Sequence, residues 1–388
     1  MSYTWNVATK VLFGAGKLKE LHKEALPGQK ALVVISNGKS TRLNGSLDAL
    51  LKELELAKVE HVLFDRIEAN PLEPTVQAGV EFGRESQVDF VIGLGGGSVM
   101  DSAKAIAATI PQDGGRVWDY MATGTGEHRP LKAKPLPTVA ITTSAGTGSE
   151  VDGGSVITSP VTHEKAAFMG PCPVLAIVDP VLMLTVPPKF TAYQGFDALF
   201  HSTEGFISKY GNEMAALVQR EAIRNIGRSL PIAVADGKNL AARTDVAFAN
   251  TLSGYSMEAS SCTSEHSLEH ALSGEHQDLP HGAGLIMISL AYYRHFIERG
   301  ACPEKFVEMA KLLGKEDATR PDDFLVALAD LQKACGVDHL KMSDYGISPD
   351  EFPRMAQLAR SALGALFDCD PLPLSDDDIV QIFTDSYR

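Results

Sequence analysis

The pattern of apolar residues changes once along this chain of 388 residues, at Pro187-Pro188. Before that point, short apolar runs at 31–36, 61–65 and 88–95 read as buried strands, with helical patterns between them. Strands that alternate with helices of this length pair in parallel and carry helices on both faces of the sheet. After the proline pair, long helical patterns dominate. The sequence therefore predicts two domains, an α/β domain at residues 1–184 and an all-helical domain at residues 185–388.

The composition excludes several classes of function. Asp and Glu number 49 against 35 Lys and Arg, and the resulting net charge of -14 disfavours a nucleic acid or an anionic membrane as partner. The five cysteines are scattered and never spaced as Cys-x-x-Cys, so neither a disulfide framework nor a cysteine zinc site is indicated. No run of about 18 apolar residues occurs, and the N-terminal stretch does not read as a cleaved signal. We therefore expect a soluble, cytoplasmic protein.

A glycine-rich loop follows the third predicted strand and reads Gly95-Gly96-Gly97-Ser98. Ligands of parallel sheets bind outside the carboxyl ends of the strands. Glycines allow a ligand to approach the backbone, and Ser98 is expected to cap the next helix and leave its first amides free for a diphosphate. The loop is not G-x-G-x-x-G, and the alternative is a plain tight turn. A second candidate loop, rich in hydroxyl groups, spans residues 142–150.

Four of the eleven histidines lie between Thr263 and Gly284. His266 and His270 are four residues apart and share one face of a predicted helix, and His281 opens the next helix. Imidazole is both a common metal ligand and a side chain that titrates near neutral pH, so the cluster indicates a metal or proton-transfer site. The alternative is a solvated helix face with incidental histidines. His276, in the intervening loop, is expected at the surface.

An oxygen ligand is found on the first helix of the second domain. Asp197 and His201 are separated by one helical turn among apolar residues, where a carboxylate is costly unless it is paired or binds a metal. The alternative is an Asp–His hydrogen bond without a metal. Together with His266 and His281, this pair would form a site of one carboxylate and three imidazoles, which suits a divalent transition metal.

Several motifs, in order along nearly the whole chain, resemble those of the iron-containing (group III) alcohol dehydrogenase family. They are FGAGKLKEL, Asn70-Pro71, GGGSVMDSAKAIA, TTSAGTGSEV, AIVDP, PPKFTAYQGFDALFHSTEGFIS and the closing PHG. The resemblance implies a dinucleotide-binding α/β domain and a helical metal domain, an architecture like that of dehydroquinate synthase. It also implies hydride transfer between the nicotinamide C4 and a primary alcohol or aldehyde whose oxygen is bound to a divalent metal. Fe²⁺ is the implied metal, with Zn²⁺ as the alternative, and a homo-oligomer is expected.

The resemblance also implies roles for individual residues. The implied metal ligands are Asp197, His201, His266 and His281, and His270 is the implied catalytic residue near substrate and nicotinamide. The residues implied at the cofactor are Asn70, Gly96, Gly97, Ser98, Asp101, Thr143, Thr147 and Lys165.

Two departures from the family pattern bear on specificity. Family members commonly read AVHAMAHPLG where this chain has TSEHSLEHALSG, so both histidines are kept in different surroundings. The loop after the first strand contains Ser36, Asn37 and Lys39 and lacks the acidic residue that often holds the ribose of NAD; it resembles members that accept NADP. A carboxylate would repel a 2'-phosphate, whereas Lys39 and hydroxyl groups can bind one, so we expect NADP(H) in preference to NAD(H).

Two other functions are compatible with these motifs. A metal- and NAD-dependent lyase similar to dehydroquinate synthase would share the two-domain plan without any net change in NAD(P)H. A binding or regulatory protein that kept the fold without activity is disfavoured, because the four implied ligands and the glycine loop are intact.

Overall fold

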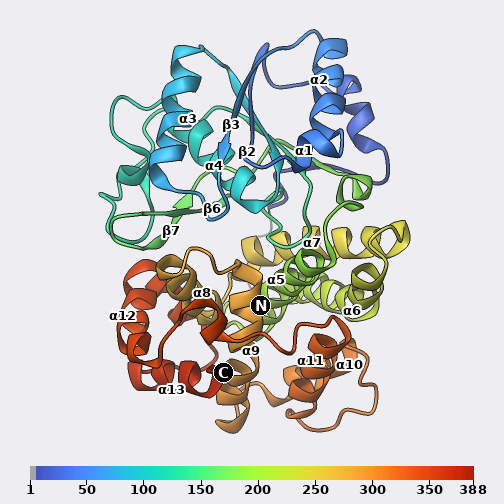
Figure 1. Cartoon of the computed structure of the whole chain (residues 1–388), viewed down its shortest axis with the longest axis vertical. Coiled ribbons are helices and arrows are strands. Elements are labelled where there is room, and N and C mark those ends of the chain that lie inside the picture. Colours follow the sequence, from blue (N-terminus) through green and yellow to red (C-terminus); the bar gives the residue numbers. More distant parts are fainter. Residues whose placement is uncertain (1–5) are drawn as a thin grey trace. The chain divides into compact units, whose positions relative to one another are not determined.

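The structure is a computed structural model that describes residues 6–388. The chain forms two compact units, drawn in Figure 1. One contains residues 6–144 and 148–185, and the other contains residues 145–147 and 186–388. Met1–Trp5, which open the predicted domain 1–184 and the stretch judged not to be a signal, lie outside the described residues.

The first unit is built on a six-stranded parallel sheet in the order β1-β8-β5-β4-β2-β3. The strands are β1 (Lys10–Phe13), β2 (Lys30–Ser36), β3 (Glu60–Ile67), β4 (Phe90–Gly95), β5 (Thr138–Thr142) and β8 (Leu175–Val178). The predicted α/β class and its parallel sheet are confirmed. Strand β1 was not predicted, because it is only four residues long, lies at the edge of the sheet and is incompletely buried.

Helices cover both faces of this sheet because alternate residues of each strand point to opposite sides. In β2, Leu32 and Val34 belong to one core and Ala31, Val33 and Ile35 to the other. The first core is completed by α3 (Glu73–Glu85) and α4 (Gly97–Thr109), the second by α2 (Ser46–Ala57) and the 3-10 helix η1 (Lys17–Lys23). Figure 1 shows α2 and α3 on opposite sides of β2 and β3. Shorter helical segments are α1 (Ser40–Leu43), η2 (Val117–Tyr120) and η3 (Pro180–Met183).

An antiparallel hairpin, β6 (Gly154–Thr158) and β7 (Lys165–Met169), was also not predicted. It is anchored by Lys104, a buried residue of α4. Its ammonium lies 2.8 Å from a carboxylate oxygen of Asp152 and donates to the carbonyls of Ser149, Asp152 and Gly154. Four acceptors offset the cost of burying this charge. The hairpin is therefore joined to α4 by a tertiary contact that no local pattern announces.

The second unit is helical throughout residues 186–388, as predicted. Its helices are α5 (Pro188–Ile207), α6 (Glu213–Ala235), α7 (Leu240–Ser260), α8 (Ser264–Glu275), α9 (His281–Glu298), α10 (Pro303–Leu312), α11 (Asp323–Ala334), α12 (Phe352–Leu363) and α13 (Asp376–Ser386), with 3-10 segments η4 (Met342–Tyr345), η5 (Pro349–Glu351) and η6 (Gly364–Cys369). Among residues 6–388 no helix is both long and apolar enough to cross a membrane.

Helices α5 and α8 form the centre of this unit. Nearly every residue of α5 from Thr191 onward is buried, as is every residue of α8 up to Gly274. A helix buried all round must pack closely against several neighbours. Gly282 in α9 permits one such approach, because a Cβ atom there would lie 2.2 Å from the backbone oxygen of Tyr193 in α5.

Candidate metal and cofactor sites

Helix α5 places three polar side chains on one face. Asp197, His201 and Glu204 are spaced by four and three residues, so they lie one above another on successive turns. All three are buried. Nδ1 of His201 lies 3.4 Å from Oδ1 of Asp197 and 3.3 Å from the backbone oxygen of Gly146. Asp197 and His201 were predicted; Glu204 was not.

Helices α8 and α9 bring two further histidines to the same carboxylate. Nε2 of His266 lies 3.4 Å from Oδ1 of Asp197, and Nε2 of His281 lies 3.5 Å from the same atom. The rings of His201 and His266 are stacked, with centroids 4.2 Å apart. One carboxylate oxygen is thus the common neighbour of three imidazoles from three helices. The four residues predicted as ligands are brought together within the helical unit.

Two buried carboxylates hold the other sides of these histidines. Nδ1 of His266 contacts a carboxylate oxygen of Glu204, and Nδ1 of His281 contacts one of Glu269. Both glutamates are completely buried. A carboxylate on Nδ1 fixes the ring orientation and leaves Nε2 free to bind a metal. The sequence contained a partial signal for Glu204, which is seven residues after Asp197 on the same face.

Glu204 has a second contact, at the start of α8. Its Oε2 accepts hydrogen bonds from the backbone N–H of Thr263 at 2.9 Å and from the hydroxyl of Thr263 at 3.0 Å. Oδ1 of Asp370 accepts from the N–H of Ser264 at 2.9 Å. Carboxyl groups from other parts of the unit therefore accept hydrogen bonds from amides at this helix terminus. The helix that carries His266 is held by the same residue that orients its imidazole.

His270 lies close to this cluster but outside it. It is buried on α8, one turn after His266, and its ring centroid is 5.1 Å from that of His281. His276 lies at the end of α8, and its Nε2 is 3.2 Å from a carboxylate oxygen of Glu351. His276 was expected at the surface, but its side chain is only 18% exposed and is therefore partly buried.

The glycine loop of the α/β unit lies at the carboxyl end of β4. The chain direction across the sheet reverses between β4 and β2, which is where such sheets bind ligands. Helix α4 begins at Gly97 with Gly96 as its N-cap, so the prediction that Ser98 caps it is wrong. Gly96 is extended and lies against Ser144, where a Cβ would come within 3.0 Å of the hydroxyl. The amides of Gly97 and Ser98 are consequently in the first turn.

The other predicted cofactor residues occupy several places. Thr143 donates its backbone N–H to the oxygen of Gly95 at 2.9 Å, so it lies beside the glycine loop. Nζ of Lys165 lies 3.3 Å from Oδ1 of Asn70. Ser36 ends β2, Asn37 follows it, and Lys39 is an exposed residue just before α1.

Asp101 and Thr147 are placed differently from the remaining predicted cofactor residues. The carboxylate of Asp101 accepts from the Ser149 hydroxyl at 2.5 Å and from the backbone N–H of Val156 at 2.9 Å, so it braces the hairpin. Thr147 belongs to the short segment 145–147 that groups with the helical unit.

Comparison with known proteins identifies the family. Residues 8–180 match the family described as iron-containing alcohol dehydrogenase, and residues 191–387 match its C-terminal part. The chain belongs to the iron-containing alcohol dehydrogenase family. The resemblance inferred from the motifs is confirmed. The enzyme is an alcohol dehydrogenase that uses a nicotinamide cofactor and a divalent metal.

Individual relatives of this iron-containing alcohol dehydrogenase are similar over most of their length. The 1,3-propanediol dehydrogenase of Citrobacter freundii is 33% identical over 373 residues, which cover 93% of this chain and 92% of that protein. The probable NADH-dependent butanol dehydrogenase 1 of Bacillus subtilis is 32% identical over 368 residues, covering 92% of each. Among solved structures, the archaeal halo-thermophilic Red Sea brine pool alcohol dehydrogenase superposes with a TM-score of 0.94 at 32% identity, covering 100% of this chain and 99% of that one.

The donor set of this dehydrogenase fits a divalent cation. Burial favours the neutral form of Asp197, but His201, His281 and His266 hold the pKa of its carboxyl well below the usual value. Burial and the nearby His266 lower the pKa of His201 to about 3, so that imidazole is neutral. Burial alone would lower the pKa of His266, yet the Glu204 carboxylate keeps it well above its ordinary value. Three carboxylates therefore surround the imidazoles and favour a positive charge at their centre.

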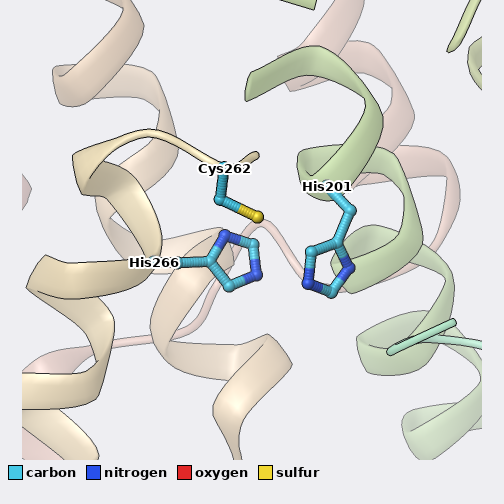
Figure 2. Close-up of side chains that lie close together, drawn as sticks. All are labelled: His201, Cys262 and His266. Carbon is cyan, nitrogen blue, oxygen red and sulfur yellow. The ribbon is translucent and has the colours of Figure 1, made fainter. Parts of the chain in front are cut away.

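Cys262 is a further donor that the sequence did not indicate. It lies between α7 and α8, and its thiol points toward the rings of His201 and His266 (Figure 2). One potential ligand atom from each of these three buried residues lies within 4.8 Å of the other two. Burial raises the pKa of the Cys262 thiol to about 11.

Proposed function

We propose that this enzyme interconverts primary alcohols and aldehydes with NADP(H), and that Asp197, His201, His266 and His281 hold its metal. Residues 1–184 would then bind the dinucleotide, and residues 185–388 the metal and substrate. The observation that carries the proposal is the position of Oδ1 of Asp197, which lies 3.4–3.5 Å from nitrogen atoms of all three histidines. The names of two relatives, a 1,3-propanediol dehydrogenase and a butanol dehydrogenase, support a primary alcohol as substrate.

The residues around the proposed metal position have different roles. When bound, the metal supplies a Lewis acid for the substrate's oxygen. Glu204 and Glu269 keep His266 and His281 in the orientation that turns Nε2 toward Asp197. His270, 5.1 Å from the ring of His281, is the residue we assign to proton transfer, since imidazole gains and loses a proton near neutral pH.

In the α/β unit, the amides of Gly97 and Ser98 at the start of α4 would bind the pyrophosphate, where the helix dipole favours an anion. Gly96, Asp101, Thr143, Thr147, Asn70 and Lys165 complete the proposed cofactor set. Preference for NADP(H) rests on Ser36, Asn37 and Lys39 and on the absence of a carboxylate in that loop. The relative named as NADH-dependent makes NAD(H) the alternative.

The cofactor proposal is tested by comparing kcat/KM for NADPH and NADH with one aldehyde. We expect a preference for NADPH that shrinks in Lys39→Ala and reverses in Ser36→Asp, because the new carboxylate repels the 2'-phosphate. A tenfold or greater preference of the unmodified enzyme for NADH contradicts it.

The metal proposal is tested by elemental analysis of the purified enzyme and of single variants. Iron is expected, with zinc as the alternative. His266→Ala and His281→Ala should lose metal and turnover together, whereas His270→Ala should keep the metal and lose rate. His276→Ala is the matched control, since the side chain of this histidine, in the same stretch, contacts Glu351, and the variant should keep both. Turnover that persists without metal would refute the assignment.

The proposal extends to the assembly and location of the enzyme. A homo-oligomer is expected and is measured directly by sedimentation velocity. A cytoplasmic location agrees with the cysteines, all five of which lie among the described residues and none of which forms a disulfide.

A further inference from the structure

The thiol of Cys262 lies beside the proposed metal ligands. The thiol forms a cluster with His201 and His266, in which one potential ligand atom from each residue lies within 4.8 Å of the other two. A second cluster, Asp197, His266 and His281, satisfies the same criterion. His266 belongs to both, so an ion bound to His266 has a sulfur atom in its immediate surroundings. Figure 2 shows the thiol and the two rings pointing toward a common centre.

The distances require only small movements. Zinc lies about 2.3 Å from a thiolate sulfur and about 2.0–2.1 Å from an imidazole nitrogen, so donors around one tetrahedral ion are roughly 3.5 Å apart. From separations of up to 4.8 Å, the donor atoms need to close by about 1 Å, which side-chain rotation supplies.

The backbone around Cys262 is held in an unusual conformation. Ser261, the preceding residue, has φ of 62° and ψ of 167°, a combination that is nearly restricted to glycine. Tertiary contacts fix both sides of it: the Ser208 hydroxyl donates to the oxygen of Ser260 at 2.9 Å, and Glu204 accepts from the N–H of Thr263. The strained residue therefore sits where the chain turns the thiol toward the histidines. Strain of this kind persists only where surrounding contacts enforce it.

We propose that Cys262 is a thiolate ligand of the metal centre, and that His201, Cys262 and His266 together bind thiophilic divalent ions such as Zn²⁺, Co²⁺ and Cd²⁺. On binding, the S–H bond breaks, a sulfur–metal bond forms and the proton passes to solvent, with no change of oxidation state. Thiolate is a softer donor than imidazole or carboxylate, so it shifts preference from Fe²⁺ toward Zn²⁺. The inference rests on the proposed function in that His201 and His266 must face the metal.

Absorption of the Co²⁺-loaded enzyme tests this inference directly. Full-length apoenzyme is titrated with Co²⁺, and the near-ultraviolet band of sulfur-to-Co²⁺ charge transfer is recorded with the bound stoichiometry. We expect one Co²⁺ and the band in the unmodified enzyme, and bound Co²⁺ without the band in Cys262→Ser and Cys262→Ala. Cys335→Ser is the matched control, because Cys335 is equally buried at the end of α11, and it should keep the band. Circular dichroism of each apoprotein verifies folding.

A competition between Zn²⁺ and Fe²⁺ provides a second measurement, in which Cys262→Ser should reduce the preference for Zn²⁺ at least tenfold. One Co²⁺ bound without the band, or a band that survives in Cys262→Ser, overturns the role of Cys262 and leaves the proposed metal centre standing. If the unmodified enzyme binds no Co²⁺, or His266→Ala binds it as tightly, both this inference and the proposed metal centre fail.

Discussion

Replacing Glu269 by Gln should weaken metal binding without unfolding the enzyme. Glu269 is completely buried in α8, and its carboxylate contacts Nδ1 of His281, whose Nε2 is 3.5 Å from Asp197. Gly284 leaves room for the Glu269 side chain, because a Cβ atom at position 284 would lie only 2.7 Å from Cγ of Glu269. Glutamine keeps the shape and a hydrogen-bond acceptor but removes the negative charge that makes His281 a stronger ligand.

The size of the effect follows from the role of Glu269 as a partner of a ligand. Loss of such a partner typically reduces metal affinity 10- to 100-fold, or about 1.4–2.7 kcal/mol. The assay is competition between apoenzyme and a chromophoric chelator for Zn²⁺, with thermal unfolding of the apoprotein recorded alongside. Metal affinity should fall while the unfolding temperature of the apoprotein does not.

Glu265→Gln is the matched control for this substitution. Glu265 is another fully buried residue of α8, and its carboxyl group interacts with the side chain of Tyr293. Burial raises the pKa of its carboxyl well above the usual value, which favours the neutral form. We expect the metal affinity of Glu265→Gln to lie within about threefold of that of the unmodified enzyme. This change is smaller than the loss of about 10-fold or more expected when the carboxylate partner of a metal ligand is removed. An unchanged affinity in Glu269→Gln, or an equal loss in both variants, would refute the positioning role.

Three further predictions concern stability. Gly282→Ala should destabilise the helical unit by at least about 1–3 kcal/mol, since its Cβ would lie 2.2 Å from a backbone oxygen of α5. Gly364→Ala is the control and should be tolerated, because there is open space around its Cβ. Thermal unfolding of the two variants tests this difference. Burial raises the pKa of Asp370 from 3.8 to about 7, so the folded state binds this proton more tightly and Asp370 makes stability fall as pH rises from about 4 to 7. Asp370→Asn should remove this loss of stability, so that by pH 8 its free energy of unfolding has gained about 4 kcal/mol relative to that of the unmodified enzyme. The free energies of unfolding are measured by urea denaturation across this pH range, and parallel profiles for the two proteins would contradict the prediction. Lys104→Met should cost about 3–5 kcal/mol by removing the ammonium that faces the buried Asp152 carboxylate, measured as a lower unfolding temperature.

Periodicity accounted for the overall architecture. The burial of β2 and β4 is a property of short segments, and an unbroken apolar run in the sequence indicates it directly. The edge strand β1 and the hairpin β6–β7 were not predicted from the sequence. The strand is short, and the hairpin is held by contacts with Lys104 from a helix distant in the chain. The N-cap of α4 was also predicted wrongly, since it is Gly96, which is extended and lies against Ser144, and not Ser98.

The amino-acid sequence by itself determined the two-part fold and proposed four ligands, because Asp197 and His201 are one turn apart and the remaining histidines lie in one short stretch. Only the tertiary structure decided what surrounds those histidines. Glu204, Glu269 and Cys262 become neighbours of the imidazoles through the packing of α5, α8 and α9, of which α5 lies far from the other two along the chain. Local spacing determines which side chains share a helix face, whereas the groups that orient a ligand come from contacts between helices, and these depend on how buried helices fit together.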